Sequence, residues 1–318
     1  MLNHVIAISD LLDNPSVDGH AVADHLAGLA GGTGIKPEVS TVTGDRGSTD
    51  FVKVVVPGTS GKTAGGAAPT LGVIGRLGGI GARPEIVGLV SDADGAVSAL
   101  SVAAKLLVMA ARGDRLAGDV IVATHVCPDA PTLPHEPVPF MDSPVDIATM
   151  NAYEVGDDMD AVLSIDTTKG NRVVNHRGIA LSPTVKEGYI LRVSEDLLSV
   201  LATVTGELPV TYPITIQDIT PYGNGAHHLN SILQPATATT APVVGLAITA
   251  ASAVAGCATG ASHEADIAAA ARFGLETAKA FGDGTLHFHD QTEFRHLVSL
   301  YGSLAHFQTL GMQRSGKE

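Results

Sequence analysis

The sequence contains no tryptophan, and aromatic residues make up only 4% of its 318 residues. Its core must therefore be built mainly from Val, Leu, Ile and Ala, which agrees with a hydrophobic share of 45%. Charged residues are scarce, at 16%, whereas glycine occurs 36 times. This composition argues against a disordered or coiled-coil chain and favours an α/β protein with many strand–helix turns.

Clusters of basic residues are missing as well. Acidic residues outnumber basic ones by 33 to 19, which gives a formal net charge of −14. Binding to nucleic acids or to anionic membranes requires clustered Lys and Arg, so we expect neither kind of partner. We expect a small-molecule substrate instead. The Ala- and Gly-rich helices are also compatible with a homo-oligomer.

Cysteine occurs only twice, as Cys127 and Cys257. Two cysteines cannot form a disulfide framework, and a reducing compartment is their natural setting. The first residues, MLNHVIAISDLLDNPS, lack the basic segment and long apolar run of a signal peptide. The most apolar segment, 241–261, contains Pro242 and many small residues, which favours a buried strand and loop over a membrane span. We therefore predict a cytoplasmic protein.

Helical and strand-like patterns alternate along the chain, without repeats or linkers. Apolar residues at helical spacing predict helices at about 17–30, 95–112, 145–155, 194–206, 263–281 and 290–309. Runs of β-branched residues between them predict strands, among them 51–56 and 119–124. This alternation predicts a single three-layer α/β/α domain over residues 1–318, with a mainly parallel central sheet and mixed edges.

Polar residues follow the predicted strands. In parallel sheets, ligands bind at the carboxyl ends of the strands. The stretch IVATHVCPDAPTLPH, at 121–135, ends its apolar run in His125 and opens a rigid Pro-rich connector over about 126–144. Carboxylates and imidazoles at such positions bind divalent metals or transfer protons. We predict a site with one or two metal ions, zinc being the expected one, whose ligands are Asp92, Asp94, His125, Asp166, His227 and His263.

Other residues are assigned roles around this metal site. Asp129 lies between Pro128 and Pro131 and is predicted to be the catalytic base, acting beside His125. Arg177 is predicted to bind a substrate carboxylate through two parallel hydrogen bonds. His228 is predicted to contact the substrate or to stabilise an oxyanion.

Two further motifs suggest alternative chemistry. The stretch VVVPGTSGKTAGG, at 54–66, is similar to a phosphate-binding loop, but Val56 replaces the required first glycine and AGGAAP cannot begin a helix. We therefore interpret it as a flexible Gly-rich loop near the site. Cys127 beside His125 allows a metal-independent isomerase, although Pro128 removes one common oxyanion donor.

The order of these features resembles the co-catalytic zinc aminopeptidases, which have a phosphorylase/hydrolase-like fold. The resemblance implies that the aspartate bridging two metals is Asp94 or Asp92 in the sequence DADG, and that Asp166 and His263 are later ligands. Two positions depart from the pattern: Thr124-His125 replaces a Glu-Glu pair, and PGTSGK stands where a first histidine ligand is expected.

Two longer segments resemble an uncharacterised bacterial family associated with AroM-type proteins. They are THVCPDAPTLPHEPVPFMDSPVD and SIDTTKGNRVVNHRGIALSPTVKEGYI. This resemblance implies little about the chemistry.

The leading hypothesis is a metal-dependent hydrolase of an amide, peptide or lactam bond in a small amino-acid-like substrate. The alternative is a non-catalytic protein that binds a small molecule or another protein on a degenerate aminopeptidase-like fold. The two altered positions favour this alternative. A convergent set of ligands in the structure would support the hydrolase, whereas a pocket without one would support binding.

Overall fold

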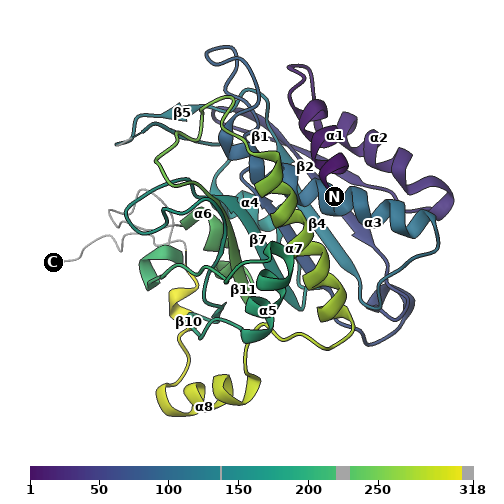
Figure 1. Ribbon diagram of the computed structural model, residues 1–318, viewed down its shortest axis with the longest axis vertical. Coiled ribbons are helices and arrows are strands. Elements are labelled where there is room, and N and C mark those ends of the chain that lie inside the picture. The colour runs from purple at the N-terminus through teal and green to yellow at the C-terminus, as the bar shows by residue number, and fades with distance from the viewer. Residues whose placement is uncertain (137, 220–229, 310–318) are drawn as a thin grey trace.

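The computed structural model describes residues 1–136, 138–219 and 230–309 (Figure 1). Among these residues, nine strands form one sheet. In spatial order they are β1 (Glu38–Gly44), β2 (Gly47–Val56), β4 (Val120–Val126), β3 (Leu71–Arg76), β7 (Ala161–Thr167), β11 (Val243–Thr249), β9 (Val185–Lys186) and β10 (Tyr189–Ile190), with β8 (Gly178–Leu181) also pairing with β11. The central strands β4, β3, β7 and β11 are parallel, and the remaining pairings are antiparallel. The predicted mainly parallel sheet with mixed edges is confirmed.

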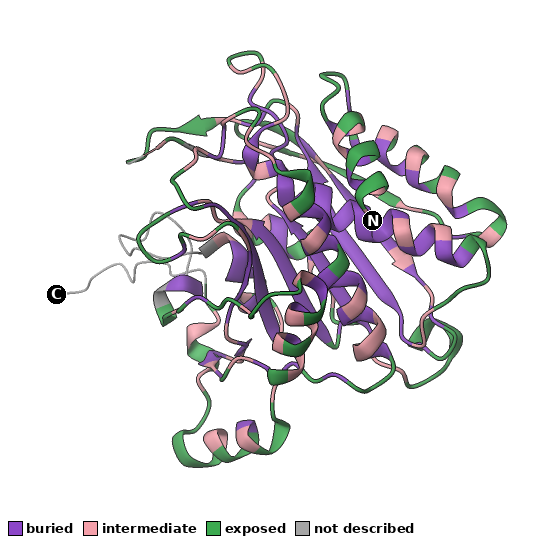
Figure 2. Cartoon of the chain, viewed as in Figure 1, coloured by how far each residue is buried: buried purple, intermediate pink, exposed green. Residues whose placement is uncertain are grey.

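Helices cover both faces of the sheet. The first face packs against α2 (Gly19–Ala30), α3 (Asp94–Ala111) and α7 (Glu264–Gly282). On the same side, α1 (Leu2–Leu12) packs on α3 and α7, α5 (Glu195–Thr205) packs on α7, and the apolar residues of these five helices contribute to the main core. The second face packs against the shorter helices α4 (Ile147–Glu154) and α6 (Asn230–Leu233). Figure 2 shows that the strands are buried between these layers, while exposed residues gather on the outer sides of the helices and on the loops. The three-layer α/β/α architecture is therefore confirmed.

The helix predictions agree with the structure over the core and fail at both ends of the chain. α2, α3 and α7 lie within one or two residues of the predicted bounds. α1 was not predicted, and the last helix is only α8 (Gln291–Tyr301), shorter than the predicted 290–309. One segment, Ser91–Ala111, is long and apolar enough to cross a membrane, but 89% of it is buried inside the protein. Its apolar character is therefore that of a core helix.

The Gly-rich loop after β2 lies at the wrong edge of the sheet for the role predicted from sequence. Because β2 runs antiparallel to β4, the end of β2 lies beside the start of β4. Asp119 fixes the loop there by accepting hydrogen bonds from the backbone N–H groups of Gly58 (2.7 Å) and Thr63 (2.9 Å). Lys62 Nζ donates to Asp160 at 2.9 Å. The predicted flexible loop near a site is thus an anchored turn, far from the carboxyl ends of the central strands.

Helix α3 begins in close contact with the central strands. A Cβ atom on Gly95 would collide with the carbonyl oxygens of Arg76 and Ile165, so only glycine allows this approach. The first residue of the helix, Asp94, is therefore held directly beside the ends of β3 and β7.

The connectors after β3 and β4 extend the sheet beyond the ends of these strands. The Cys127 N–H donates to the Gly78 carbonyl (2.9 Å), and the Ile80 N–H donates to the Cys127 carbonyl (3.0 Å). The Ala130 N–H then donates to Gly81 at 3.0 Å. The Pro-rich connector also forms a small hairpin of β5 (Thr132–Leu133) and β6 (Phe140–Met141). The start of this stretch is therefore held to the connector after β3 by backbone hydrogen bonds.

Candidate functional site

A cavity of about 870 Å³ opens at the carboxyl ends of the central strands. It lies where the strand-end rule predicts a ligand site, next to the ends of β3, β7 and β11. Leu77, Met141 and Val254 are among its apolar lining residues. Its polar lining residues are Asp92, His135, Asp166, Thr167, Thr168, Lys169, Asn171, Arg172, Asn175 and Ser231.

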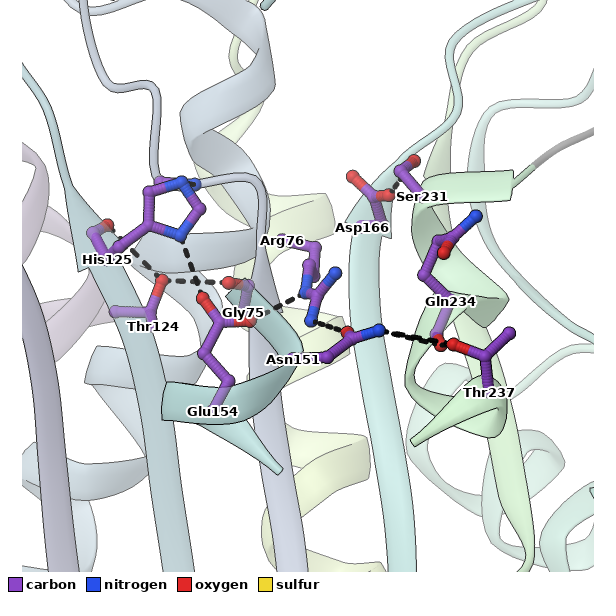
Figure 3. A network of polar contacts seen from close by, with 11 residues as sticks. Gly75, Arg76, Thr124, His125, Asn151, Glu154, Asp166, Ser231, Gln234 and Thr237 are labelled. Atoms are coloured by element: carbon purple, nitrogen blue, oxygen red, sulfur yellow. Dashed lines mark hydrogen bonds and ion pairs between the residues drawn. The ribbon is translucent and has the colours of Figure 1, made fainter. Parts of the chain in front are cut away.

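Asp166 is buried at the end of β7 and is held by two hydrogen bonds. Its Oδ1 accepts the N–H of Thr167 at 2.7 Å, and its Oδ2 accepts the hydroxyl of Ser231 (Figure 3). Burial raises the pKa of this carboxyl to about 6, although both hydrogen bonds and the nearby charge of Arg76 oppose the shift. Asp166 can therefore gain or lose a proton near neutral pH.

Asp92 and Asp94 lie just before and at the start of α3. Burial raises the pKa of Asp92 to about 8, and the negative charges of Asp166 and Asp94 add to this shift. Asp94 has no exposed surface, and burial raises its pKa as well. The structure thus brings together three of the predicted ligands, close enough for their charges to interact.

A lysine that the sequence analysis did not select completes this group. Lys169 Nζ lies 2.5 Å from Asp94 Oδ2 and donates a hydrogen bond to the carbonyl of Ala261 at 2.8 Å. Its side chain is only 2% exposed. Lys169 follows Asp166 by three residues, so its position after a strand was a usable signal. A lysine is not an expected metal ligand, and it was therefore not predicted as a site residue.

His125 belongs to a separate buried network (Figure 3). Its Nε2 accepts the backbone N–H of Gly78 at 3.1 Å, so this nitrogen carries no proton. Its Nδ1 therefore carries the proton and donates to Glu154 Oε1 at 2.8 Å. Both ring nitrogens are engaged, and neither can bind a metal in this arrangement. His125 connects β4 to α4 instead of acting as a ligand.

Glu154 joins His125 to a fully buried arginine. Its Oε2 lies 2.6 Å from Arg76 Nε, and a terminal nitrogen of Arg76 donates to Asn151 Oδ1 at 2.6 Å. Burial opposes ionisation of Glu154. The charge of Arg76 and the contacts with His125 outweigh it and hold the pKa of this carboxyl below its usual value. Neither Arg76 nor Glu154 was selected from the sequence, because each needs a partner that is distant in the chain.

The remaining predicted residues are placed as follows. Asp129 is exposed, absent from the described lining of the cavity, and 3.4 Å from the thiol of Cys127. Arg177 is 67% exposed and lies 3.4 Å from Asp266, beside a different hollow. His263 is an exposed residue at the start of α7 whose charge acts on Asp94. His227 and His228 lie outside the described residues.

The residues present do not fit the predicted metal centre. In the part of the chain that the structure describes, no group of three or more His, Cys, Asp or Glu side chains could hold a metal ion. The reason is visible in the contacts. Asp94 faces the Lys169 ammonium, Asp166 accepts hydrogen bonds at both oxygens, and both nitrogens of His125 are engaged.

The fold is similar to that of two solved aminopeptidases. Cytosol aminopeptidase from Coxiella burnetii matches with a TM-score of 0.54 and 12% identity, over 90% of this chain and 69% of that one. A mutant of tomato leucine aminopeptidase matches with a TM-score of 0.52 and 12% identity, over 86% of this chain and 61% of that one. At this identity the likeness establishes the fold alone, and it confirms the expected aminopeptidase-like architecture.

Sequence comparison gives the family. No curated protein sequence matches the chain. The predicted association with AroM-type proteins stays a prediction. Residues 40–311 match the family described as "Protein of unknown function (DUF1177)", and the chain belongs to this family.

Proposed function

We propose that this protein binds a small amino-acid-like molecule in the strand-end cavity. The observation that carries the proposal is the lining itself: Asp92 and Asp166 can face an ammonium group, and Arg172 can face a carboxylate, within one cavity. A volume of about 870 Å³ lies in the range of small-molecule sites.

The acidic side of the cavity favours a cationic group. Asp92 is hard to ionise because desolvation and the nearby charges of Asp166 and Asp94 oppose its negative charge. A ligand ammonium placed beside these carboxylates would add a positive charge to that of Lys169 and stabilise their ionised forms. Ligand binding would then release a proton from Asp92 near neutral pH.

The opposite charge comes from the loop after β7. Arg172 is exposed and lines the cavity, three residues beyond Lys169. Its planar guanidinium can bind a carboxylate through two parallel hydrogen bonds. Arg172 therefore takes the role that the sequence analysis gave to Arg177, which lies elsewhere.

Calorimetric titration with a panel of amino acids, dipeptides and lactams tests this proposal. We expect at least one member to bind the wild type, and Asp92→Asn and Arg172→Met to weaken its binding about tenfold or more. Arg177→Met is the matched control, because it removes the same charge outside the cavity, and it should leave affinity unchanged. Equal affinity in all four proteins would place binding elsewhere and refute the proposal. So would a panel in which no compound binds.

A second candidate is the metal-dependent hydrolase of an amide, peptide or lactam bond. The observation that favours it is the Asp94 carboxylate, which is completely buried beside the ends of β3 and β7. A carboxylate is a hard oxygen ligand that suits a divalent metal. Additional ligands would have to come from His227 or His228, and the base would be Asp129 or another residue.

Metal analysis separates the two candidates. The hydrolase predicts stoichiometric zinc in the purified protein, loss of that metal in Asp94→Asn, and amide hydrolysis that chelators abolish. A protein that is metal-free and inactive toward amides, yet binds an amino-acid-like ligand, supports the first proposal and excludes the second.

A further inference from the structure

The Lys169 ammonium lies beside two of the acidic side chains of the site, Asp94 and Asp92. It is 2.5 Å from Oδ2 of Asp94, and its charge also acts on Asp92. Both members of the Lys169–Asp94 pair are almost fully buried, at 2% and 0% exposure. A buried pair of this kind is stable only when the two charges are in close contact and further hydrogen bonds complete it.

Further contacts fix the position of the ammonium. Lys169 follows β7 directly, and its Nζ donates to the carbonyl of Ala261, in the loop that precedes α7. Asp94 is fixed independently by the tight packing of Gly95 on the central strands. The two charges are therefore held together by three separate segments of the chain, rather than by one flexible side chain that meets another.

We infer that Lys169 is the resident cation of this site, and that it takes the place that a divalent metal would occupy beside Asp94. An ammonium group supplies one positive charge without requiring several ligands in a fixed geometry, so the three carboxylates need not converge on one point. The same charge repels a divalent ion approaching Asp94. Lys169 thus keeps the site free of metal.

The inference predicts what removing the ammonium does. Without Lys169, Asp94 loses its ion-pair partner, and Asp92 loses a nearby positive charge. The carboxylates of Asp94 and Asp92 are hard oxygen ligands, and one or two such ligands suffice for Mg²⁺ or Mn²⁺ when water completes the coordination. Replacing Lys169 by a neutral residue of similar length should therefore create a divalent-cation site.

Mn²⁺ binding tests this directly. It is measured as the decrease of the free Mn²⁺ signal in electron paramagnetic resonance. Wild type should bind Mn²⁺ weakly. Lys62→Met, which removes a lysine charge at the opposite edge of the sheet, is the control and should bind Mn²⁺ equally weakly. Lys169→Met should bind one ion at least about tenfold more tightly, since one unit charge at contact distance is worth more than that factor. The double variant Lys169→Met with Asp94→Asn should lose the gained affinity.

Several outcomes would overturn the inference. The first is stoichiometric metal in the purified wild type, and the second is equal Mn²⁺ affinity in wild type and a folded Lys169→Met. If Lys169→Met does not fold in metal-free buffer, refolding is repeated with Mn²⁺. Recovery of the native circular dichroism spectrum supports the inference, and failure to recover contradicts it. The inference concerns the cavity of the proposed function, but it is measured by metal binding and not by ligand binding. It can therefore fail while the amino-acid-like ligand still binds, and it can hold while no such ligand binds.

Discussion

Nδ1 of His125 lies 2.8 Å from Oε1 of Glu154, inside the protein and away from any exposed surface. Through Glu154 the contact continues to Arg76, which is also completely buried. A histidine from β4, an acid from α4 and an arginine from β3 are thus joined beneath the cavity. Their function is to hold the ends of two central strands in a fixed relation to α4.

Removing the acid from this network should strongly destabilise the fold. Glu154→Gln leaves the Arg76 charge buried without its ionic partner, which costs about 3–5 kcal/mol in the free energy of unfolding. Urea denaturation measures this value. Glu293→Gln breaks the exposed pair with Arg192 and is the matched control, with a much smaller expected loss. Similar small losses for both variants would show that the buried network contributes little.

The raised pKa of Asp92 makes stability depend on pH. A carboxyl whose pKa rises from 3.8 to about 8 on folding favours the folded state fully below pH 4, and this contribution is lost as the pH rises toward 8. Asp92→Asn cannot ionise, so its stability relative to wild type should increase with pH, by at most about 1.4 kcal/mol per pH unit. Denaturant titrations from pH 5 to 9 measure the difference. Parallel curves for the two proteins would contradict the assignment.

The thiol of Cys127 should not react in the folded protein. It is 1% exposed, and burial raises its pKa to about 12, so almost no thiolate forms at pH 8. Iodoacetamide labelling followed by peptide mass spectrometry should detect modification of Cys127 only after urea is added. Rapid labelling of the native protein would restore the hypothesis of an isomerase that uses this cysteine.

Two glycine-to-alanine variants should change stability in opposite directions. Gly95→Ala forces a methyl group against two backbone carbonyls at the start of α3, which should cost several kcal/mol. Gly28→Ala, in α2, meets no neighbouring atom and should stabilise the helix by about 0.5–1 kcal/mol. Thermal unfolding compares them. A stable Gly95→Ala would mean that α3 is not held against the strands as described.

The sequence was sufficient to locate the cavity, two acids in its lining and a third acid beside them, because apolar strands ending in polar residues are a local pattern. Asp92, Asp94 and Asp166 followed from it. The role of His125 did not, since the partners that engage its ring are Gly78 and Glu154, which are 47 and 29 residues away. A histidine's position in a strand says nothing about which groups will face its two nitrogens.

The misplacement of the Gly-rich loop has a different cause. A run such as 51–56 predicts a strand but not its direction. The antiparallel pairing of β2 with β4 carries the following loop to the opposite edge of the sheet. Lys169 was missed for a chemical reason: a lysine after a strand is usually solvated, and its burial depends on Asp94, which comes from another segment.

The paired connectors after β3 and β4 make one side of the cavity more constrained by backbone hydrogen bonds than the other side. On one side the cavity is lined by Leu77 and Met141. The adjoining residues 78–82 and 127–130 hold each other through their backbones, so a change in one connector displaces the other. On the other side, residues 171–173 and 251–253 present exposed side chains. Amino-acid substitutions that change which molecule enters are therefore expected to accumulate at 171–173 and 251–253. The connector side is expected to tolerate fewer substitutions.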